Sequence, residues 1–330
     1  MRNSHFTFFL ATALLLTACS SDDDSVQEPA DATLLPLTIE VAENPYVNPD
    51  EAGSRETRAA IATTSSLTAF QLNYNYVYGG TPSTSDTDIA VTTDGNHKWV
   101  ASSDWPTSAG RTKVVNWYAK SVGDFIYFNY KENDPYIDFT MVEDASNLVD
   151  LLVATATGSY SDTGGKLSFT FDHACTALRF YVKKATNLND YTLTVSLIKL
   201  CNVKKKGEYH YNTSSWSSVG TNANFSLYSG SAKTLGSSEY EALDTENGPY
   251  LFVVPQTLTA WDTTTDIAST SGTYFELNCK LTRISDSQQV FSGTAYIPFS
   301  ATLNAGYQHD VKINIGKNSL YQSPNQKVIP

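Results

Sequence analysis

Leu35-Pro36-Leu37-Thr38-Ile39-Glu40-Val41 places an apolar residue at every second position. Because successive side chains of a β-strand point to opposite faces, this period of two predicts a strand with one buried face over residues 33–41. Pro36 has no backbone N–H to donate, so it suits a strand start or an edge strand. The residues expected on the buried face are Leu35, Leu37, Ile39 and Val41.

The same alternation recurs later in the chain, at residues 167–171, 178–182, 275–281 and 311–315. A continuous apolar run at residues 250–254 predicts a central strand, buried on both faces. Short strands separated by Gly, Asn, Asp and Ser turns are typical of β-sandwiches. We therefore expect an all-β fold.

A turn-rich segment, Gly158-Ser159-Tyr160-Ser161-Asp162-Thr163-Gly164-Gly165, interrupts the strands near the middle of the chain. The length of the chain also suits two domains of ordinary size. We expect an N-terminal β-sandwich over residues 59–160, completed by the strand at 33–41. A C-terminal β-sandwich is expected over residues 161–330.

The composition excludes several classes of protein. Charged residues make up only 17% of the chain and there are 20 tyrosines, which favours β-structure over a disordered or helical chain. The net charge of −12 argues against nucleic acid as a partner.

The N-terminus resembles that of an exported lipoprotein. A short apolar run follows Arg2 and ends in Leu16-Thr17-Ala18-Cys19, which has the form of a lipobox. The run is too short to span a bilayer, so residues 1–18 are predicted to be a signal peptide. Cys19 would then carry the lipid that anchors the protein in the outer membrane, with residues 19–58 forming a tether, the first strand and a loop. The alternative is an ordinary secretory signal with a chance cysteine.

Three cysteines follow Cys19, namely Cys175, Cys201 and Cys279. They permit one disulfide and a free thiol, or three buried thiols that behave as small core residues.

No catalytic motif stands out, and we expect no enzymatic activity, no cofactor and no metal. His173 has only Asp172 and Cys175 nearby in sequence, at no recognised spacing, so a hydrogen-bonded histidine at a strand end is favoured. The other candidate group is acidic: Asp134, Asp138 and Asp144 lack the ligand spacing of a calcium site and fit solvated turns and strand faces better.

Five tryptophans offer a possible contact with sugars. Such residues more often fill the core of a sandwich than bind glycan. They are Trp99, Trp105, Trp117, Trp216 and Trp261.

Six segments form an ordered series along nearly the whole mature chain. They are Trp99-Val100-Ala101-Ser102-Ser103-Asp104-Trp105-Pro106, Val115-Asn116-Trp117-Tyr118-Ala119, Asp150-Leu151-Leu152-Val153-Ala154, Phe169-Thr170-Phe171-Asp172-His173-Ala174, Val254-Pro255-Gln256 and Leu303-Asn304-Ala305-Gly306-Tyr307. In their order and spacing they resemble the fimbrillin family of type V pilins. The resemblance implies two transthyretin-like β-sandwich domains, export as a lipoprotein and assembly into fimbriae with other subunits. It also implies that an arginine-specific protease removes the first strand, whose groove a strand of a neighbouring subunit then fills.

The loop after the first strand holds two arginines, Arg55 and Arg58. With the resemblance, cleavage after Arg58 is favoured over Arg55 and would leave Ala59 as the new N-terminus. The alternative is two solvated arginines in a linker. Exposed polar loops are where proteolytic nicking concentrates.

The last residues of the sequence bear on which position the subunit would take in a fimbria. Residues 316–330 lack an alternating pattern and contain Pro324 and Pro330, so they make a poor donor strand. The alternative is that residues 310–315 detach and serve as the donor strand. A poor donor strand favours a tip or accessory subunit that contributes to adhesion. The alternative function is a permanently anchored surface lipoprotein that binds glycan or a host ligand and keeps Cys19.

Overall fold

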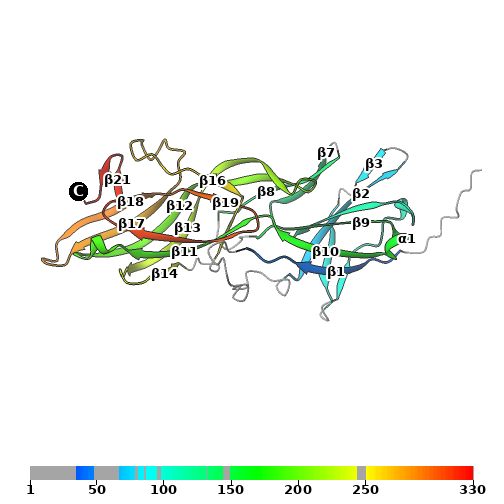
Figure 1. Cartoon of the computed structure of the whole chain (residues 1–330), viewed down its shortest axis with the longest axis horizontal. Coiled ribbons are helices and arrows are strands. Elements are labelled where there is room, and N and C mark those ends of the chain that lie inside the picture. Colours follow the sequence, from blue (N-terminus) through cyan, green and yellow to red (C-terminus); the bar gives the residue numbers. More distant parts are fainter. Residues whose placement is uncertain are drawn as a thin grey trace, which may run out of the picture. The chain divides into compact units, whose positions relative to one another are not determined.

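The computed structural model describes residues 35–47, 67–78, 81–84, 87–94, 98–131, 133–143, 149–243 and 250–329 (Figure 1). These residues belong to one compact unit, Leu34–Pro330. The residues predicted to carry the lipid or the cleavage site, Cys19, Arg55 and Arg58, lie outside the described residues, as does Asp144. Among the described residues, no helix is long and apolar enough to cross a membrane.

The all-β prediction is confirmed, because strands dominate the described part of the chain. Its one α-helix is a single short turn, α1 at Tyr160–Thr163. Two 3-10 turns lie at Thr107–Ala109 and Thr186–Leu188.

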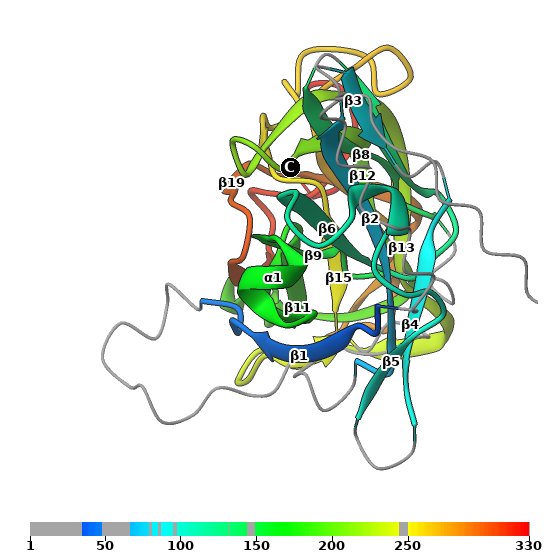
Figure 2. The ribbon, with the colours of Figure 1, turned by 90° about the vertical axis from the view of Figure 1, so that its right-hand side faces the viewer.

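The first sheet has eight strands, and its pairings close on themselves. Its members are β1 Thr38–Glu43, β2 Ala69–Tyr78, β3 Thr81–Thr84, β4 Ile89–Thr93, β5 Trp99–Ala101, β6 Val115–Ser121, β9 Leu152–Gly158 and β10 Lys166–His173. The order is β3-β2-β4-β5-β1-β10-β9-β6, and β6 also pairs with β2. The strands from β2 round to β6 therefore form a closed ring that includes β1. Figure 2 faces these strands, with β1 in blue.

The remaining strands form three further sheets. The second sheet contains β11 Thr176–Lys184, β14 Glu241–Leu243, β15 Leu251–Val253 and β20 Gln308–Ile315. The third contains β7 Ile126–Lys131, β8 Asp134–Thr140, β12 Tyr191–His210, β13 Ser215–Thr234, β17 Tyr274–Arg283, β18 Gln289–Pro298, β21 Tyr321–Ser323 and β22 Gln326–Lys327. A two-stranded sheet pairs β16 Gln256–Leu258 with β19 Ala301–Leu303.

Two parallel pairs join segments that are distant in sequence. β1 runs parallel to β10, from Thr38 opposite Lys166 to Glu43 opposite Phe171. β20 runs parallel to β11, which follows β10 directly in the chain. The continuous stretch of β10 and β11 thus carries one parallel partner on each strand.

The sheets do not divide at residue 160. β10 lies beyond that position, yet it pairs with β1 and β9 in the first sheet. β7 and β8 lie before it, yet β8 pairs with the distal part of β12 in the third sheet. The division into two domains over 59–160 and 161–330 therefore stays a prediction.

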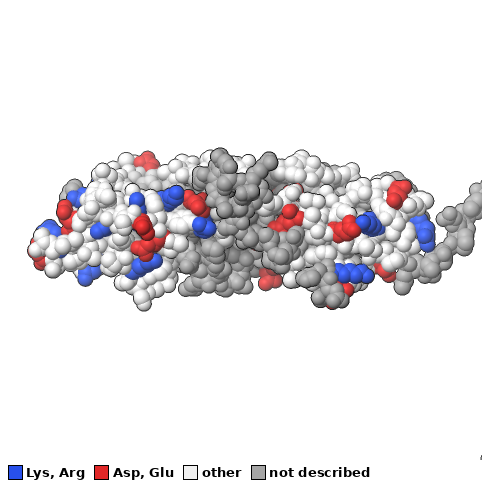
Figure 3. Space-filling view, turned by 60° about the horizontal axis from the view of Figure 1, so that its bottom comes forward, with Lys and Arg blue, Asp and Glu red and all other residues white. Residues whose placement is uncertain are grey.

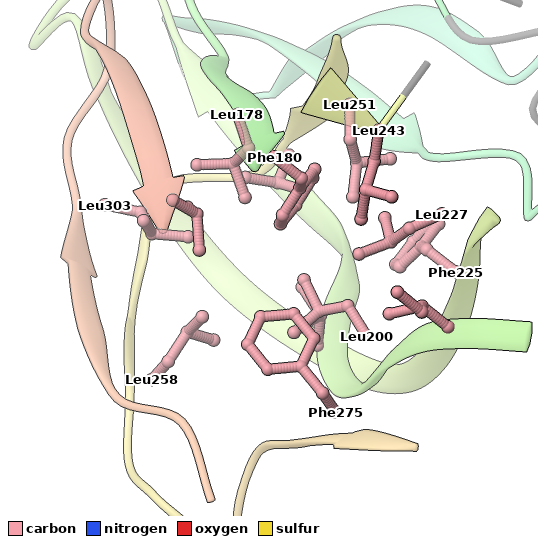
Figure 4. Close-up of a cluster of buried hydrophobic side chains, with 14 of the residues drawn as sticks. Leu178, Phe180, Leu200, Phe225, Leu227, Leu243, Leu251, Leu258, Phe275 and Leu303 are labelled. Carbon is pink, nitrogen blue, oxygen red and sulfur yellow. The ribbon is translucent and has the colours of Figure 1, made fainter. Parts of the chain in front are cut away.

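Two large groups of buried apolar residues form the interior. One includes Phe70, Trp105, Trp117 and Phe169 and lies among the strands of the first sheet. The other, larger group lies among the second and third sheets, and Figure 4 shows Phe180, Leu200 and Phe275 among its members. On the face shown in Figure 3, charged side chains of both signs are scattered without forming one large patch of a single sign.

Candidate functional site

β1 occupies a place inside the closed ring of the first sheet. Six residue pairs join β1 to β10, whereas in the described part of the chain β5 is joined to it at one pair, Ile39 opposite Trp99. β1 therefore depends on one strong neighbour and one weak one. Its removal would break the ring and leave unpaired backbone groups along β10, which template pairing with another strand.

The apolar face of β1 and of the residues before it packs into the core of the first sheet. Leu35 and Ile39 are buried, and Leu37 and Val41 are partly buried against the same core. The strand itself begins at Thr38 instead of residue 33, and the backbone oxygen of Leu35 accepts a hydrogen bond from Trp105 N at 2.9 Å. Lack of a donor at Pro36 explains why ladder pairing begins later.

A glycine allows the close approach of the segment before β1. Gly165 has φ +79°, and a Cβ there would lie 2.4 Å from the carbonyl oxygen of Pro36 and 2.6 Å from Cε2 of Tyr160. The Gly165 carbonyl oxygen accepts from Thr38 N at 2.9 Å. Gly165 thus adopts a left-handed backbone conformation and, because it lacks a Cβ, leaves room for the segment before β1 to pack closely.

Four buried polar side chains meet where β1 ends, namely Glu43, Tyr46, Asp150 and His173, and we call them the Glu43 cluster. His173 Nδ1 lies 2.6 Å from Asp150 Oδ2, and His173 Nε2 lies 3.1 Å from Glu43 Oε1. The Tyr46 hydroxyl donates to Asp150 Oδ1 at 2.7 Å. The Tyr46 ring also stacks on the imidazole, with ring centroids 3.8 Å apart. Glu43 and Tyr46 come from the first-strand segment, while Asp150 and His173 come from the rest of the fold.

The electrostatics of the Glu43 cluster are dominated by burial. The side chains of His173 and Glu43 are only 1% and 3% exposed. Burial raises the pKa of Glu43, with the attraction of His173 opposing it and repulsion from Asp150 adding to it. Burial, with the nearby Asp150 charge, also raises the pKa of Tyr46 well above its ordinary value.

The contact between Glu43 and His173 is close but poorly aligned. Their 3.1 Å separation is an ion-pair distance, yet among the described residues neither His173 Nε2 nor the two Glu43 oxygens make a hydrogen bond of good geometry. The short distance and the shared burial still make this a strong contact, because two polar groups enclosed together interact strongly even when misaligned.

The segment after β1 continues onto the second sheet. Val47 N donates to Gly306 O at 2.8 Å, and Gln308 N donates to Val47 O at 2.9 Å, just where β20 begins. Asn44 also donates from its side chain to Asp172 Oδ1 at 2.7 Å. The first-strand segment is therefore held from Leu35 to Val47 by the first sheet, the Glu43 cluster and the start of β20.

The structure places the other predicted site residues apart from β1. Cys175, Cys201 and Cys279 are all buried free thiols. Asp134 and Asp138 lie on β8, where they contact His210 and Lys206 respectively. Within the described ranges, no group of three or more His, Cys, Asp or Glu side chains is arranged to hold a metal ion.

The tryptophans divide between the core and more exposed positions. Trp105 and Trp117 are buried and pack edge to face, with ring centroids 5.4 Å apart, and Trp261 is also buried. Trp99 and Trp216 are partly buried. The core interpretation is confirmed for the three buried rings.

The prediction for His173 is confirmed, since it ends β10 and is hydrogen-bonded, but its partners were missed. Asp150 lies 23 residues away in sequence, so no local spacing reveals it. The burial of Glu43 could have been predicted from the sequence, because Glu43 is the next odd-numbered position after the inward-facing residues of the predicted strand. An acidic residue on a buried face requires a partner.

Comparison with known protein families identifies the family to which the chain is similar. Residues 57–327 match the fimbrillin-like family, a match that begins beyond β1 and confirms the resemblance found in the sequence. No curated protein matches the chain.

One solved structure supports the fold, and two others are more distantly similar. A fimbrial protein from Bacteroides vulgatus is 16% identical, with a TM-score of 0.54 and coverage of 86% of this chain and 96% of that chain. A proposed cell adhesion protein from Bacteroides ovatus is 12% identical, with a TM-score of 0.47 and coverage of 87% and 94%. Another from Bacteroides uniformis is 15% identical, with a TM-score of 0.45 and coverage of 87% and 95%. Since the family match spans most of the chain, this protein belongs to the fimbrillin-like family.

Proposed function

We propose that this chain is a subunit of a type V cell-surface fimbria, exported as a lipoprotein through Cys19 and matured by arginine-specific cleavage after Arg58. Cleavage separates β1 from the body of the protein. A strand of another subunit then takes the place of β1 between β10 and β5.

The position of β1 inside the closed ring carries this proposal. β1 precedes Arg58 in the sequence, whereas its six backbone partners lie on β10, far beyond it. A cut after Arg58 would therefore leave β1 held by non-covalent contacts alone. Burial of Leu35 and Ile39 contributes roughly 3–6 kcal/mol gross, and the partly buried Leu37 and Val41 add to it, so the empty groove favours pairing with a new strand.

The contacts of the C-terminal residues support a tip or accessory position. β21 and β22 form a hairpin, and β21 pairs with β18. Leu320, just before this hairpin, is buried in the larger core. Residues 316–329 are thus used within their own fold and do not present a donor strand to a neighbour.

The N-terminus of the protein on the cell surface tests the proposal. We expect mass spectrometry to find Ala59 as the first residue, in material that co-purifies with other fimbrial subunits. Arg58→Ala should block this maturation, while Arg55→Ala serves as the matched control and should not. Full-length protein with an acylated Cys19 in assembled material would overturn the proposal and favour a permanently anchored lipoprotein.

A further inference from the structure

The groove that β1 would vacate has a polar end. His173 and Asp150 are nearly inaccessible, with side chains 1% and 7% exposed, and both remain in the protein after a cut at Arg58. Glu43 and Tyr46 leave with the first strand. Departure of β1 therefore removes half of the Glu43 cluster and leaves a buried histidine and aspartate facing an empty place.

Departure of β1 removes the polar neighbour of one His173 nitrogen but not that of the other. Nδ1 keeps its 2.6 Å contact with Asp150 Oδ2, whereas Nε2 loses the carboxylate of Glu43 at 3.1 Å. Asp150 also loses the hydrogen bond from the Tyr46 hydroxyl. An incoming strand that buries these atoms again without partners would lose affinity, because unpaired buried polar groups are unfavourable.

The geometry points to a groove that selects its donor strand by chemistry as well as by apolar pattern: the strand must present a hydrogen-bond acceptor to His173 Nε2. This inference rests on the proposed strand exchange. The replaced strand gives the pattern, with apolar residues at four alternate positions, an acceptor such as Glu or Gln two residues later, and tyrosine three residues after that. A lysine or an aliphatic residue at the acceptor position is rejected.

The occupant that fits this pattern is a strand of a different subunit. Residues 316–330 of a second copy include two glutamines that could accept a hydrogen bond, but they contain no run of four apolar residues at alternate positions. They are also paired with β18 or packed in the core of their own chain. The apolar pattern of the groove thus favours assembly between unlike chains.

Peptide exchange tests the selection directly. The full chain from Ser20 would carry a site-specific protease sequence within residues 55–60, so that cleavage does not depend on Arg58. After cleavage, excess labelled peptide spanning residues 34–48 competes with the retained first strand, and fluorescence polarisation reports its binding. The parent peptide is compared with three variants that carry Glu43→Lys, Glu43→Leu or Glu43→Gln. Thr38→Lys is the matched control, because Thr38 is exposed on the same strand.

We expect the parent, Glu43→Gln and Thr38→Lys peptides to bind within a few-fold of one another. The Glu43→Lys and Glu43→Leu peptides should bind about 10- to 100-fold more weakly, as expected when a buried polar group is left without its polar neighbour. In a protein carrying His173→Gln, this discrimination should shrink. Equal binding of all five peptides would overturn the selection while leaving strand exchange intact. Failure of even the parent peptide to bind would overturn both.

Discussion

Asp150 Oδ2 lies 2.6 Å from Nδ1 of His173, with both side chains buried. The other oxygen of Asp150 accepts from the Tyr46 hydroxyl, so this carboxylate links the body of the protein to the segment that follows β1. A second His–Asp pair, His210 with Asp134 at 2.7 Å, lies on the third sheet, and its Asp134 side chain is 42% exposed. The two pairs share chemistry but differ in access to water.

Asp150→Asn should therefore destabilise the protein by about 1–3 kcal/mol, because the amide cannot accept at both contacts and leaves a buried group badly paired. The matched change Asp134→Asn should shift stability by less than about 1 kcal/mol, as exposed pairs contribute little. Urea unfolding of each variant measures the difference. Equal losses would show that burial does not strengthen the Asp150–His173 pair.

Gly164 and Gly165 allow the docking of β1 to be tested with one substitution. Both have positive φ, at +63° and +79°, but an added Cβ at Gly164 meets nothing within 4 Å, whereas at Gly165 it meets Pro36 O at 2.4 Å. Gly164→Ala should lose about 1–2 kcal/mol from backbone strain alone. Gly165→Ala should lose more and should speed hydrogen exchange at Thr38 N, which bonds to Gly165 O. Identical behaviour of the two variants would contradict the role given to the close approach.

The three buried thiols should be inert in the folded protein. Burial raises the pKa of Cys201 and of Cys279 to about 12 each, and raises that of Cys175 well above its ordinary value. Because the thiolate is the reactive form, labelling at pH 8 should be at least roughly 1000-fold slower than for a free cysteine. A chain beginning at Ser20 should gain three labels only after unfolding in guanidinium. Rapid labelling of the native protein would show that a thiol is accessible.

The alternating pattern predicted much of the fold. Residues 167–171, 178–182, 275–281 and 311–315 all lie in strands in which buried side chains alternate with exposed or partly buried ones, as expected. Periodicity succeeds here because each of these strands has one face in the core. The run at 250–254 is the exception: its strand β15 is three residues long and pairs only with β11 among the described strands. Its burial comes from packing against the larger core, which an apolar run cannot distinguish from a central position.

Long-range pairing lay beyond the sequence pattern. β1 pairs with β10 across 128 residues, and nothing in either strand's alternation specifies its partner or its parallel direction. The meeting of Glu43, Asp150 and His173 follows from that pairing, so it was equally hidden. The boundary near residue 160 was inferred from turn residues, whereas β10 and β8 cross it to pair with distant strands.

The raised pKa of Glu43 predicts how its contribution to stability changes with pH. Burial is the main cause, so the carboxyl binds a proton more readily in the folded protein than in the unfolded chain. A raised folded-state pKa contributes stability that is fully present below the unfolded value, near 4.3, and is lost as pH rises through the folded value. The stability of the wild type relative to Glu43→Gln should therefore fall as pH increases from about 4 toward neutrality. Unfolding of both proteins across this range measures it, and a constant or rising difference would contradict the prediction.

Lys120 on β6 forms an ion pair in which only the lysine is buried, so the two partners should respond differently to mutation. Its side chain is fully buried, and its Nζ lies 3.0 Å from Asp88 Oδ2 and also contacts Gln71 and the Ile126 carbonyl oxygen. Burial lowers the pKa of Lys120, and Asp88 opposes that shift. Asp88→Asn leaves a buried ammonium without its counter-charge and should lose about 3 kcal/mol.

Lys120→Met should lose less than Asp88→Asn, about 1 kcal/mol or below. Methionine fills the same space without a charge, and the Asp88 side chain, 36% exposed, can be hydrated once its partner is gone. Guanidinium unfolding of the two single variants and of the double variant separates the pair energy from packing. A larger loss in Lys120→Met than in Asp88→Asn would mean that the contacts with Gln71 and Ile126, and not the ion pair, govern the stability of this site.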